Sequence, residues 1–204
     1  MRTRLFASIL FLMFSVAASA QGLLTAKAAA DLTSISGGSL IDYSGKIGGR
    51  LGLSYTHYMS NHWYVEPEAN ISYNTWKMKE LYSIDIDDHI IDNHFRNISL
   101  NIPVMFGYSI PVGAQHINIY MGPQVSYNLC NKWVIDDKLS KDEFDDNALN
   151  TDYNKFTFSL KAGVGVVIDD YTVAIEGAMG LNEMYKDSSN TYKNVFSLVL
   201  GYSF

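Results

Sequence analysis

A single cysteine, Cys130, is present among the 204 residues, so no disulfide bond can form within the chain. Proline is scarce, with 4 residues, and charged residues make up 18% of the chain, which is below the usual quarter. Acidic residues outnumber basic ones by 21 to 15, and this balance gives no support to nucleic-acid binding. Beyond residue 20, no apolar run approaches the length of a transmembrane helix.

The first twenty residues differ in character from the rest. Arg2 and Arg4 precede an apolar run from Leu5 to about Val16, and small residues follow up to Ala20. This arrangement is typical of a secretory signal peptide with an A-x-A cleavage site. We therefore expect residues 1–20 to be a signal peptide and residues 21–204 to be one domain.

Strict alternation of apolar and polar residues is the main pattern in that domain. In "KFTFSLKAGVGVVI", residues 155–168, every second residue from Phe156 to Ile168 is apolar, and Lys161 lies on the other face. Such alternation predicts a strand with two unlike faces. A transmembrane β-strand needs only about 9–11 residues of this kind, so the absence of an apolar helix does not exclude a membrane location.

Eight stretches alternate in this way: 22–32, 46–58, 62–74, 95–109, 115–127, 155–168, 171–182 and 194–204. The connections between them contain about 13, 3, 20, 5, 27, 2 and 11 residues, with an error of 2–4 residues at each boundary. Long and short connections thus alternate. This pattern predicts an all-β fold, an eight-stranded antiparallel up-and-down transmembrane β-barrel with long loops at one rim and tight turns at the other.

The two faces of these strands indicate which side is inside. The apolar faces carry no charged residue, whereas the polar faces are rich in Gly, Ser and Asn, as expected for a crowded interior. We therefore expect an apolar, lipid-facing surface that includes Phe156, Phe158, Leu160, Val164, Leu198 and Leu200. We expect a lumenal ion-pair network of Lys27, Arg50, Glu66, Glu68, Lys161 and Glu176, because unpaired buried charge is costly.

Two adjacent stretches resemble a known family. "NISLNIPVMFGYSI" (97–110) and "INIYMGPQVSYNL" (117–129) are similar to paired strands of PorT-like outer-membrane β-barrel proteins, and the "GYSF" ending is similar too. The resemblance implies a barrel of OmpX-like size in the outer membrane of a Gram-negative bacterium. It also implies that Phe204 is an assembly signal for the barrel assembly machinery. Asn101 stands where the family commonly has a glutamate, and Pro103 predicts a bulge or kink in its strand.

Other chemistry has weak support in the sequence. Asp85, Asp87, Asp88, His89, Asp92 and His94 are close together but match no metal-binding motif, so we expect no metal and no cofactor. The five histidines lie near turns or in a loop, and none forms an obvious pair with a serine on a strand. We therefore expect no enzymatic activity.

The pattern and the resemblance together predict an outer-membrane barrel with a side-chain-filled lumen. Its role would be structural or interactive, and the expected partners are outer-membrane lipid, the assembly machinery at the C-terminal strand and a protein bound by the long loops. Three alternatives stay open: a small passive pore, a secretion-system accessory barrel and a lipid-modifying barrel enzyme.

Overall fold

The computed structural model describes residues 22–36, 42–79, 92–136, 153–184 and 191–204. These residues form nine β-strands: β1 (Leu23–Ser36), β2 (Asp42–Gly45), β3 (Ile47–Tyr58), β4 (Trp63–Lys79), β5 (Asp92–Val112), β6 (Gln115–Asp136), β7 (Phe156–Ile168), β8 (Tyr171–Gly180) and β9 (Tyr192–Ser203). None of the described segments is a helix long and apolar enough to cross a membrane.

The strands close into one antiparallel barrel. Its wall runs β4-β3-β1-β9-β8-β7-β6-β5, and β5 pairs again with β4. The short β2 also pairs with β4, and only Lys46 separates it from β3, so β2 and β3 act as one strand with an irregularity between them. The described chain is therefore an eight-stranded barrel, as the alternating pattern predicts.

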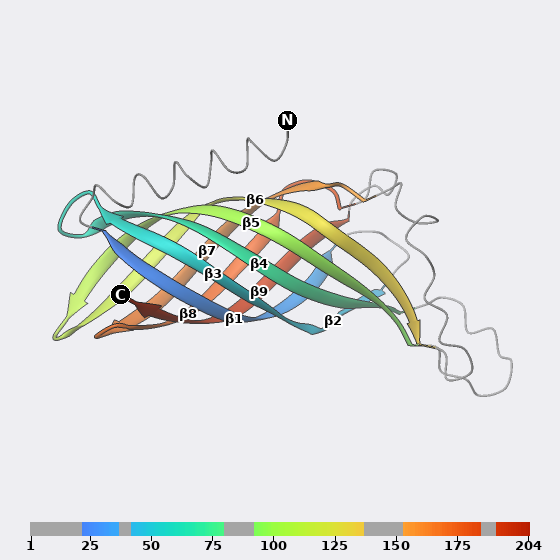
Figure 1. Ribbon diagram of the computed structural model, residues 1–204, viewed down its shortest axis with the longest axis horizontal. Helices are drawn as coiled ribbons and strands as arrows, with labels where there is room; N and C mark the ends of the chain where they lie inside the picture. The colour runs from blue at the N-terminus through green and yellow to red at the C-terminus, as the bar shows by residue number, and fades with distance from the viewer. Residues whose placement is uncertain (1–21, 37–41, 80–91, 137–152, 185–190) are drawn as a thin grey trace, which may run out of the picture.

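All tight turns lie at one end of the barrel. They connect β3 with β4, β5 with β6 and β7 with β8, and the two ends of the described chain lie at this same end (Figure 1). Gly113 and Asp169 take the left-handed backbone conformation in two of these turns, with φ of 65° and 51°. The longer connections all lie at the opposite end. We refer to these as the turn end and the loop end.

The strands extend further toward the loop end than the sequence predicts. β4 continues to Lys79, β5 begins at Asp92 and β6 continues to Asp136, so parts of the predicted loops are strand. Residues 76–79 and 131–136 lack a clean apolar alternation, so the sequence pattern predicts loops there. They are nevertheless strand, since their backbones pair with those of neighbouring strands. Trp76 lies opposite Phe95, and Phe95 lies opposite Trp133.

The structure has no register shift at Pro103, so the bulge predicted there is wrong. The register shift between β5 and β6 falls between Ile98 and Ser99, whereas Pro103 pairs in register with Gln124. On its other side, pairing with β4 lapses between Val104 and Asn101 without any change of register. A proline has no backbone N–H to donate, so it interrupts one ladder locally without displacing the strand.

Candidate functional site in the barrel lumen

Buried ion pairs cross the middle of the lumen. The Glu176 carboxylate lies 2.5 Å from Nη2 of Arg50 and 2.8 Å from Nζ of Lys161. It also accepts a 3.0 Å hydrogen bond from the Tyr120 hydroxyl. These groups come from β3, β6, β7 and β8, so Glu176 joins opposite parts of the barrel wall.

A second carboxylate, that of Glu68 on β4, connects the rest of the network. It lies 3.4 Å from Lys27, 3.6 Å from Lys161 and 3.9 Å from Arg50. Lys27 also forms an ion pair with Glu66, and Asn70 donates a 2.6 Å hydrogen bond to Glu68. The structure thus brings together all six residues of the predicted network.

Two further charged residues of the lumen were not in that prediction. Asp31 lies 3.8 Å from Arg50 and is buried, and Lys193 donates a 2.9 Å hydrogen bond to the Asn97 side chain. The described lumen then contains Lys27, Arg50, Lys161 and Lys193 against Asp31, Glu66, Glu68 and Glu176. Equal numbers of opposite charges limit the cost of burying each of them.

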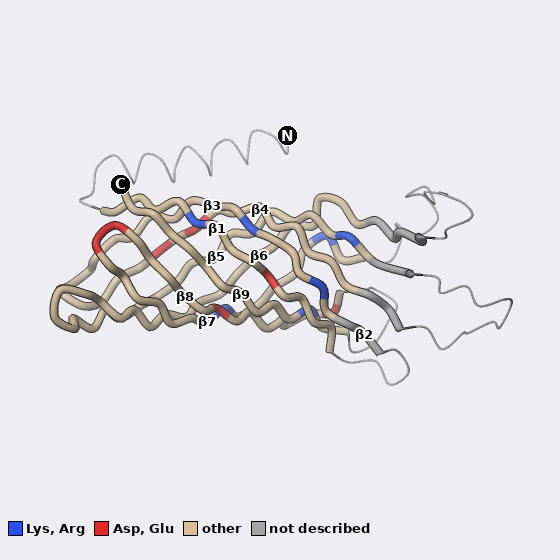
Figure 2. The backbone as a smooth tube through the Cα atoms, turned by 90° about the horizontal axis from the view of Figure 1, so that it is seen from below, with Lys and Arg blue, Asp and Glu red and all other residues tan. Residues whose placement is uncertain are grey.

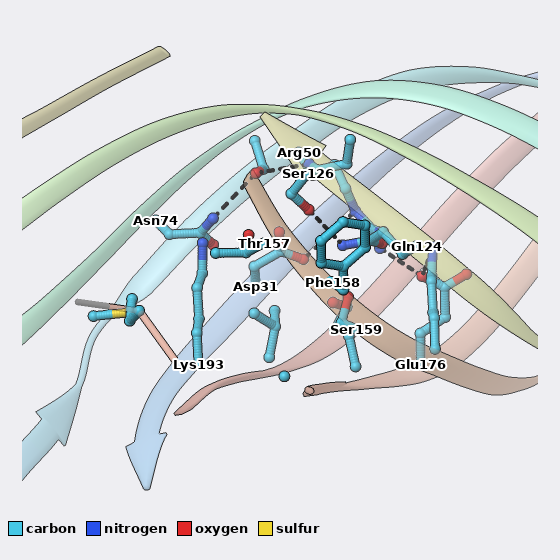
Figure 3. Close-up of a pocket in the computed structure, with 18 of the residues that line it drawn as sticks. Asp31, Arg50, Asn74, Gln124, Ser126, Thr157, Phe158, Ser159, Glu176 and Lys193 are labelled. Carbon is cyan, nitrogen blue, oxygen red and sulfur yellow. Dashed lines mark hydrogen bonds and ion pairs between the residues drawn. The ribbon is translucent and has the colours of Figure 1, made fainter. Parts of the chain in front are cut away.

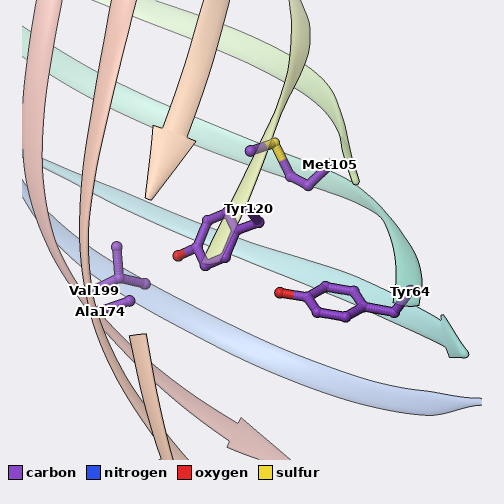
Figure 4. Close-up of a cluster of buried hydrophobic side chains, with 5 residues drawn as sticks. All are labelled: Tyr64, Met105, Tyr120, Ala174 and Val199. Atoms are coloured by element: carbon purple, nitrogen blue, oxygen red, sulfur yellow. The ribbon is translucent and has the colours of Figure 1, made fainter. Parts of the chain in front are cut away.

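Aromatic side chains fill the lumen toward the turn end. Tyr64, Met105, Tyr120, Ala174 and Val199 form a buried apolar cluster (Figure 4). The neighbouring strands leave room for the two rings with glycine: a Cβ on Gly107 would lie 2.1 Å from the Tyr64 ring, and one on Gly163 2.7 Å from that of Tyr120. No side chain larger than hydrogen therefore fits at these two positions without moving a ring.

Amides and hydroxyls occupy the lumen on the loop side of the ion pairs. Asn101 donates hydrogen bonds to Asn70 at 2.7 Å and to Ser72 at 3.0 Å. Asn97 donates to Asn128 at 3.0 Å, and Thr33 donates to Asn74, also at 3.0 Å. Asn101, the position where the resembling family has a charge, therefore works as a neutral donor within a polar layer.

A small chamber of about 40 Å³ lies beside this layer. Figure 3 shows Lys193 and Glu176 on opposite sides of it, and Asp31, Thr157 and Ser159 also line it. Met184, from the connection after β8, is fully buried and belongs to its lining too. A space of this size holds a few water molecules.

An apolar cluster covers the lumen toward the loop end. It contains Ile35, Trp76, Tyr153 and Met184, with Phe95 packed against it, and the Trp76 and Phe95 rings stack at 5.8 Å. Tyr153 and Met184 belong to connections between strands, whereas the other three residues belong to β1, β4 and β5. The described lumen is thus filled at three levels: tyrosines, ion pairs with polar groups, and this cluster.

The outer surface of the wall has the opposite character. All six residues predicted to face lipid are exposed on it, from 37% for Leu160 to 58% for Leu200. Charged residues are sparse along the described strands, as the few coloured positions of the tube show (Figure 2). In water, such a band of exposed apolar residues would be unfavourable, and a lipid bilayer is the environment that suits it.

Groups suited to catalysis or metal binding are poorly placed in the described part of the chain. Ser109 Oγ lies 3.4 Å from His116 Nδ1 near the turn end, and no described carboxylate lies within 4.0 Å of His116. No group of three or more metal-ligating side chains occurs among the described residues. The acidic loop with Asp85, Asp87, Asp88 and His89 lies outside the described residues, as does the predicted signal peptide.

Sequence reasoning missed the residues that close the two ends. Tyr64 and Tyr120 alternate correctly with outward residues, but a tyrosine in a strand is also common on a lipid-facing rim. Met184 lies outside any alternating stretch, so no periodic signal marks it. The one available signal was the glycine opposite each tyrosine, at Gly107 and Gly163, which marks where a large ring needs space.

Comparison with known proteins identifies the class of barrel. The sequence matches the family described as outer membrane protein beta-barrel domain over residues 6–204. No curated protein matches it. Among solved structures, it is similar to neisserial surface protein A, with 13% identity, TM-score 0.47 and coverage of 90% of this chain and 97% of that one. It is also similar to OprG from Pseudomonas aeruginosa, with 14% identity, TM-score 0.49 and coverage of 91% and 96%. The outer membrane enzyme PagL gives 15% identity, TM-score 0.47 and coverage of 86% and 98%.

Proposed function

The chain belongs to the family of bacterial outer membrane β-barrel proteins, and we propose that it acts as a closed membrane anchor and not as a passive pore. The loop end then carries the activity toward other molecules. The observation that carries this proposal is the filling of the lumen at three successive levels by side chains. In outer-membrane barrels the short turns face the periplasm and the longer loops face outward, so the loop end would meet the surroundings of the cell.

The ion-pair level is the strongest reason to expect a closed lumen. Glu68 and Glu176 each contact several cations that come from other strands, so their side chains span the lumen. Eight-stranded barrels are just wide enough for side chains to fill. An ion that entered would have to displace groups that already neutralise one another.

The partners proposed for this anchor follow from its surfaces. The exposed apolar band favours outer-membrane lipid. Phe204 directly follows the C-terminal strand β9, has 72% of its surface exposed and packs edge-on against Tyr202, which supports recognition of this strand by the assembly machinery. The long connections at the loop end offer the surface for a protein partner.

We further propose that the chain is not an enzyme. The contact between Ser109 and His116 is the one serine–histidine hydrogen-bond pair within the described ranges, and it lacks a carboxylate partner. Ser109 is also buried, on the same face of β5 as Gly107, which packs against the Tyr64 ring. A lipid substrate would instead require such a pair on the outer wall.

The PorT-like resemblance supports a finer proposal, that the barrel assists protein secretion. Its two characteristic stretches form β5 and β6, which are neighbours in the wall. Co-purification of the tagged protein from outer membranes tests this role. Components of a secretion system should accompany the barrel, and their absence under mild detergent would leave a stand-alone anchor.

Swelling of proteoliposomes in small sugars tests the closed anchor. We expect vesicles with the folded protein to swell no faster than protein-free vesicles. A second variant, in which a short Gly-Ser link replaces residues 137–152, should remain equally closed, because the ion pairs and the tyrosine cluster belong to the strands. Fast swelling with the parent protein would contradict the proposal.

A further inference from the structure

The closure at the loop end consists of two short segments of connecting chain. We name residues 153–154 and 182–184 the outer latch. Met184 and Tyr153 supply its apolar contacts, against Ile35 and Trp76 of the wall. Both residues lie outside the strands, and apart from an isolated β-bridge at Tyr153 no strand ladder among the described residues includes them.

Within the described residues, backbone and side-chain hydrogen bonds fasten the latch. The Asn154 backbone N–H donates to the Met184 carbonyl at 2.9 Å, and the Asn154 side chain donates to the Glu183 carbonyl at 2.8 Å. The Asn182 side chain accepts a 2.6 Å bond from the Phe158 N–H and donates a 3.1 Å bond to the Phe156 carbonyl. The Asn128 side chain of β6 donates a 2.8 Å bond to the Asn154 carbonyl, and the Met184 N–H donates a 2.8 Å bond to the Thr191 carbonyl.

The chamber beneath the latch contains charged groups with few hydrogen bonds from the described residues. Asp31 is 2% exposed, and its Oδ1 lies 3.8 Å from Arg50 Nε but accepts no hydrogen bond from the described residues. Lys193 has one hydrogen-bond acceptor there, Asn97, although an ammonium group can donate three hydrogen bonds. The buried Asp31 carboxylate and the part-buried Lys193 ammonium can both form further hydrogen bonds with water, so the chamber is suited to hydration and not to a dry core.

We propose that the outer latch is a gate, whose release opens the chamber to water and small solutes from the loop end. The ion pairs and tyrosines below it stay in place, because they belong to the strands of the wall. The open form is thus a vestibule that ends at Arg50, Lys161 and Glu176, and not a channel. It would take small polar solutes with hydrogen-bond donors for Asp31 and acceptors for Lys193.

Cysteine labelling from outside tests this gate. With Cys130→Ser as background, Ser197→Cys places a thiol in the chamber, because Ser197 lines it and is 3% exposed. A charged, membrane-impermeant methanethiosulfonate reagent is then added to refolded protein in vesicles. The double variant Asn154→Ala, Asn182→Ala removes the bonds made by the latch's own asparagine side chains, keeps the 2.8 Å bond from the Asn128 side chain to the Asn154 carbonyl, and should speed the labelling at least tenfold.

Three controls make the result decisive. Asn194→Ala removes a 2.8 Å side-chain bond to Ser36 outside the latch, and it should leave the labelling rate unchanged. Ser54→Cys, which is buried on β3 nearer the turn end than Arg50, should stay unlabelled in every variant. Heat-modifiable gel migration confirms folding of each variant, and Asn182→Ala alone replaces the double variant if the latter fails to fold.

Each other outcome overturns the proposal. Equal labelling of Ser197→Cys with and without the latch bonds would mean that the latch does not control access. Fast labelling in the parent would mean that the chamber is already open. Labelling of Ser54→Cys from the loop end would show that the inner levels open as well, and this result alone would also contradict the closed anchor.

Discussion

At the turn end the lumen is filled by side chains of the strands, such as Tyr64 and Tyr120, whereas at the loop end it is covered by Tyr153 and Met184 of the connections. The first group is fixed by the backbone ladders of the wall. Among the described residues, the second is held by side-chain and backbone bonds between connections and strand ends, not by a continuous strand ladder. One barrel can therefore have a rigid inner closure and a releasable outer closure. The predictions below test this difference, from the largest effect to the smallest.

Glu176→Ala should cause the largest loss of stability, because it leaves Arg50 and Lys161 short of a buried partner. Breaking a buried pair in this way costs about 3–5 kcal/mol. Urea unfolding in lipid vesicles measures it, and Ser197→Ala, at the register partner of Glu176, is the matched control. An unfolding free energy equal to that of the parent would mean that the ion pairs do not hold the inner half together.

Val164→Arg tests the lipid-facing side of the wall, for comparison with changes in the lumen. The Val164 side chain is exposed on the apolar band, and a charge near the bilayer midplane costs about 2–4 kcal/mol. Ser159→Arg on the same strand should cost less, because its side chain lines the polar chamber. Equal tolerance of both changes in a vesicle folding assay would show that the two faces are assigned wrongly.

Tyr120→Phe tests the inner closure at a single atom. The change removes the 3.0 Å hydrogen bond to the Glu176 carboxylate and keeps the ring against Gly163. A hydrogen bond to a charged group contributes about 1.5–3 kcal/mol. The same unfolding experiment should detect this loss, and no change would place the Tyr120 hydroxyl outside the network.

Asn154→Ala should have the smallest effect, because it removes a bond between two connections. Loss of a neutral hydrogen bond costs about 0.5–1.5 kcal/mol, and local opening of the latch need not unfold the barrel. Hydrogen exchange should show faster exchange of the Met184 amide without a change at the Val199 amide of β9. Equal acceleration at both sites would mean that the two closures are not independent.

The sequence allows much of the wall to be predicted, because residues of one strand alternate between two environments. Phe158, Ser159 and Leu160 show this directly, and so do the lumenal partners Lys161 and Glu176. The extensions of β4 and β6 could not be predicted, since residues 76–79 and 131–136 are paired by neighbours without a clean pattern of their own. Met184 could not be predicted either, because its burial depends on where a connection folds back.

Single-channel conductance of the refolded protein in a planar bilayer tests the closed lumen most directly. Heat-modifiable migration first confirms that the barrel is folded. We expect no steady conductance from the parent or from the variant with Asn154→Ala and Asn182→Ala, because the ion pairs and tyrosines remain below the latch. Steady conductance steps from the folded parent would contradict the account, since ions would then pass Arg50, Lys161 and Glu176.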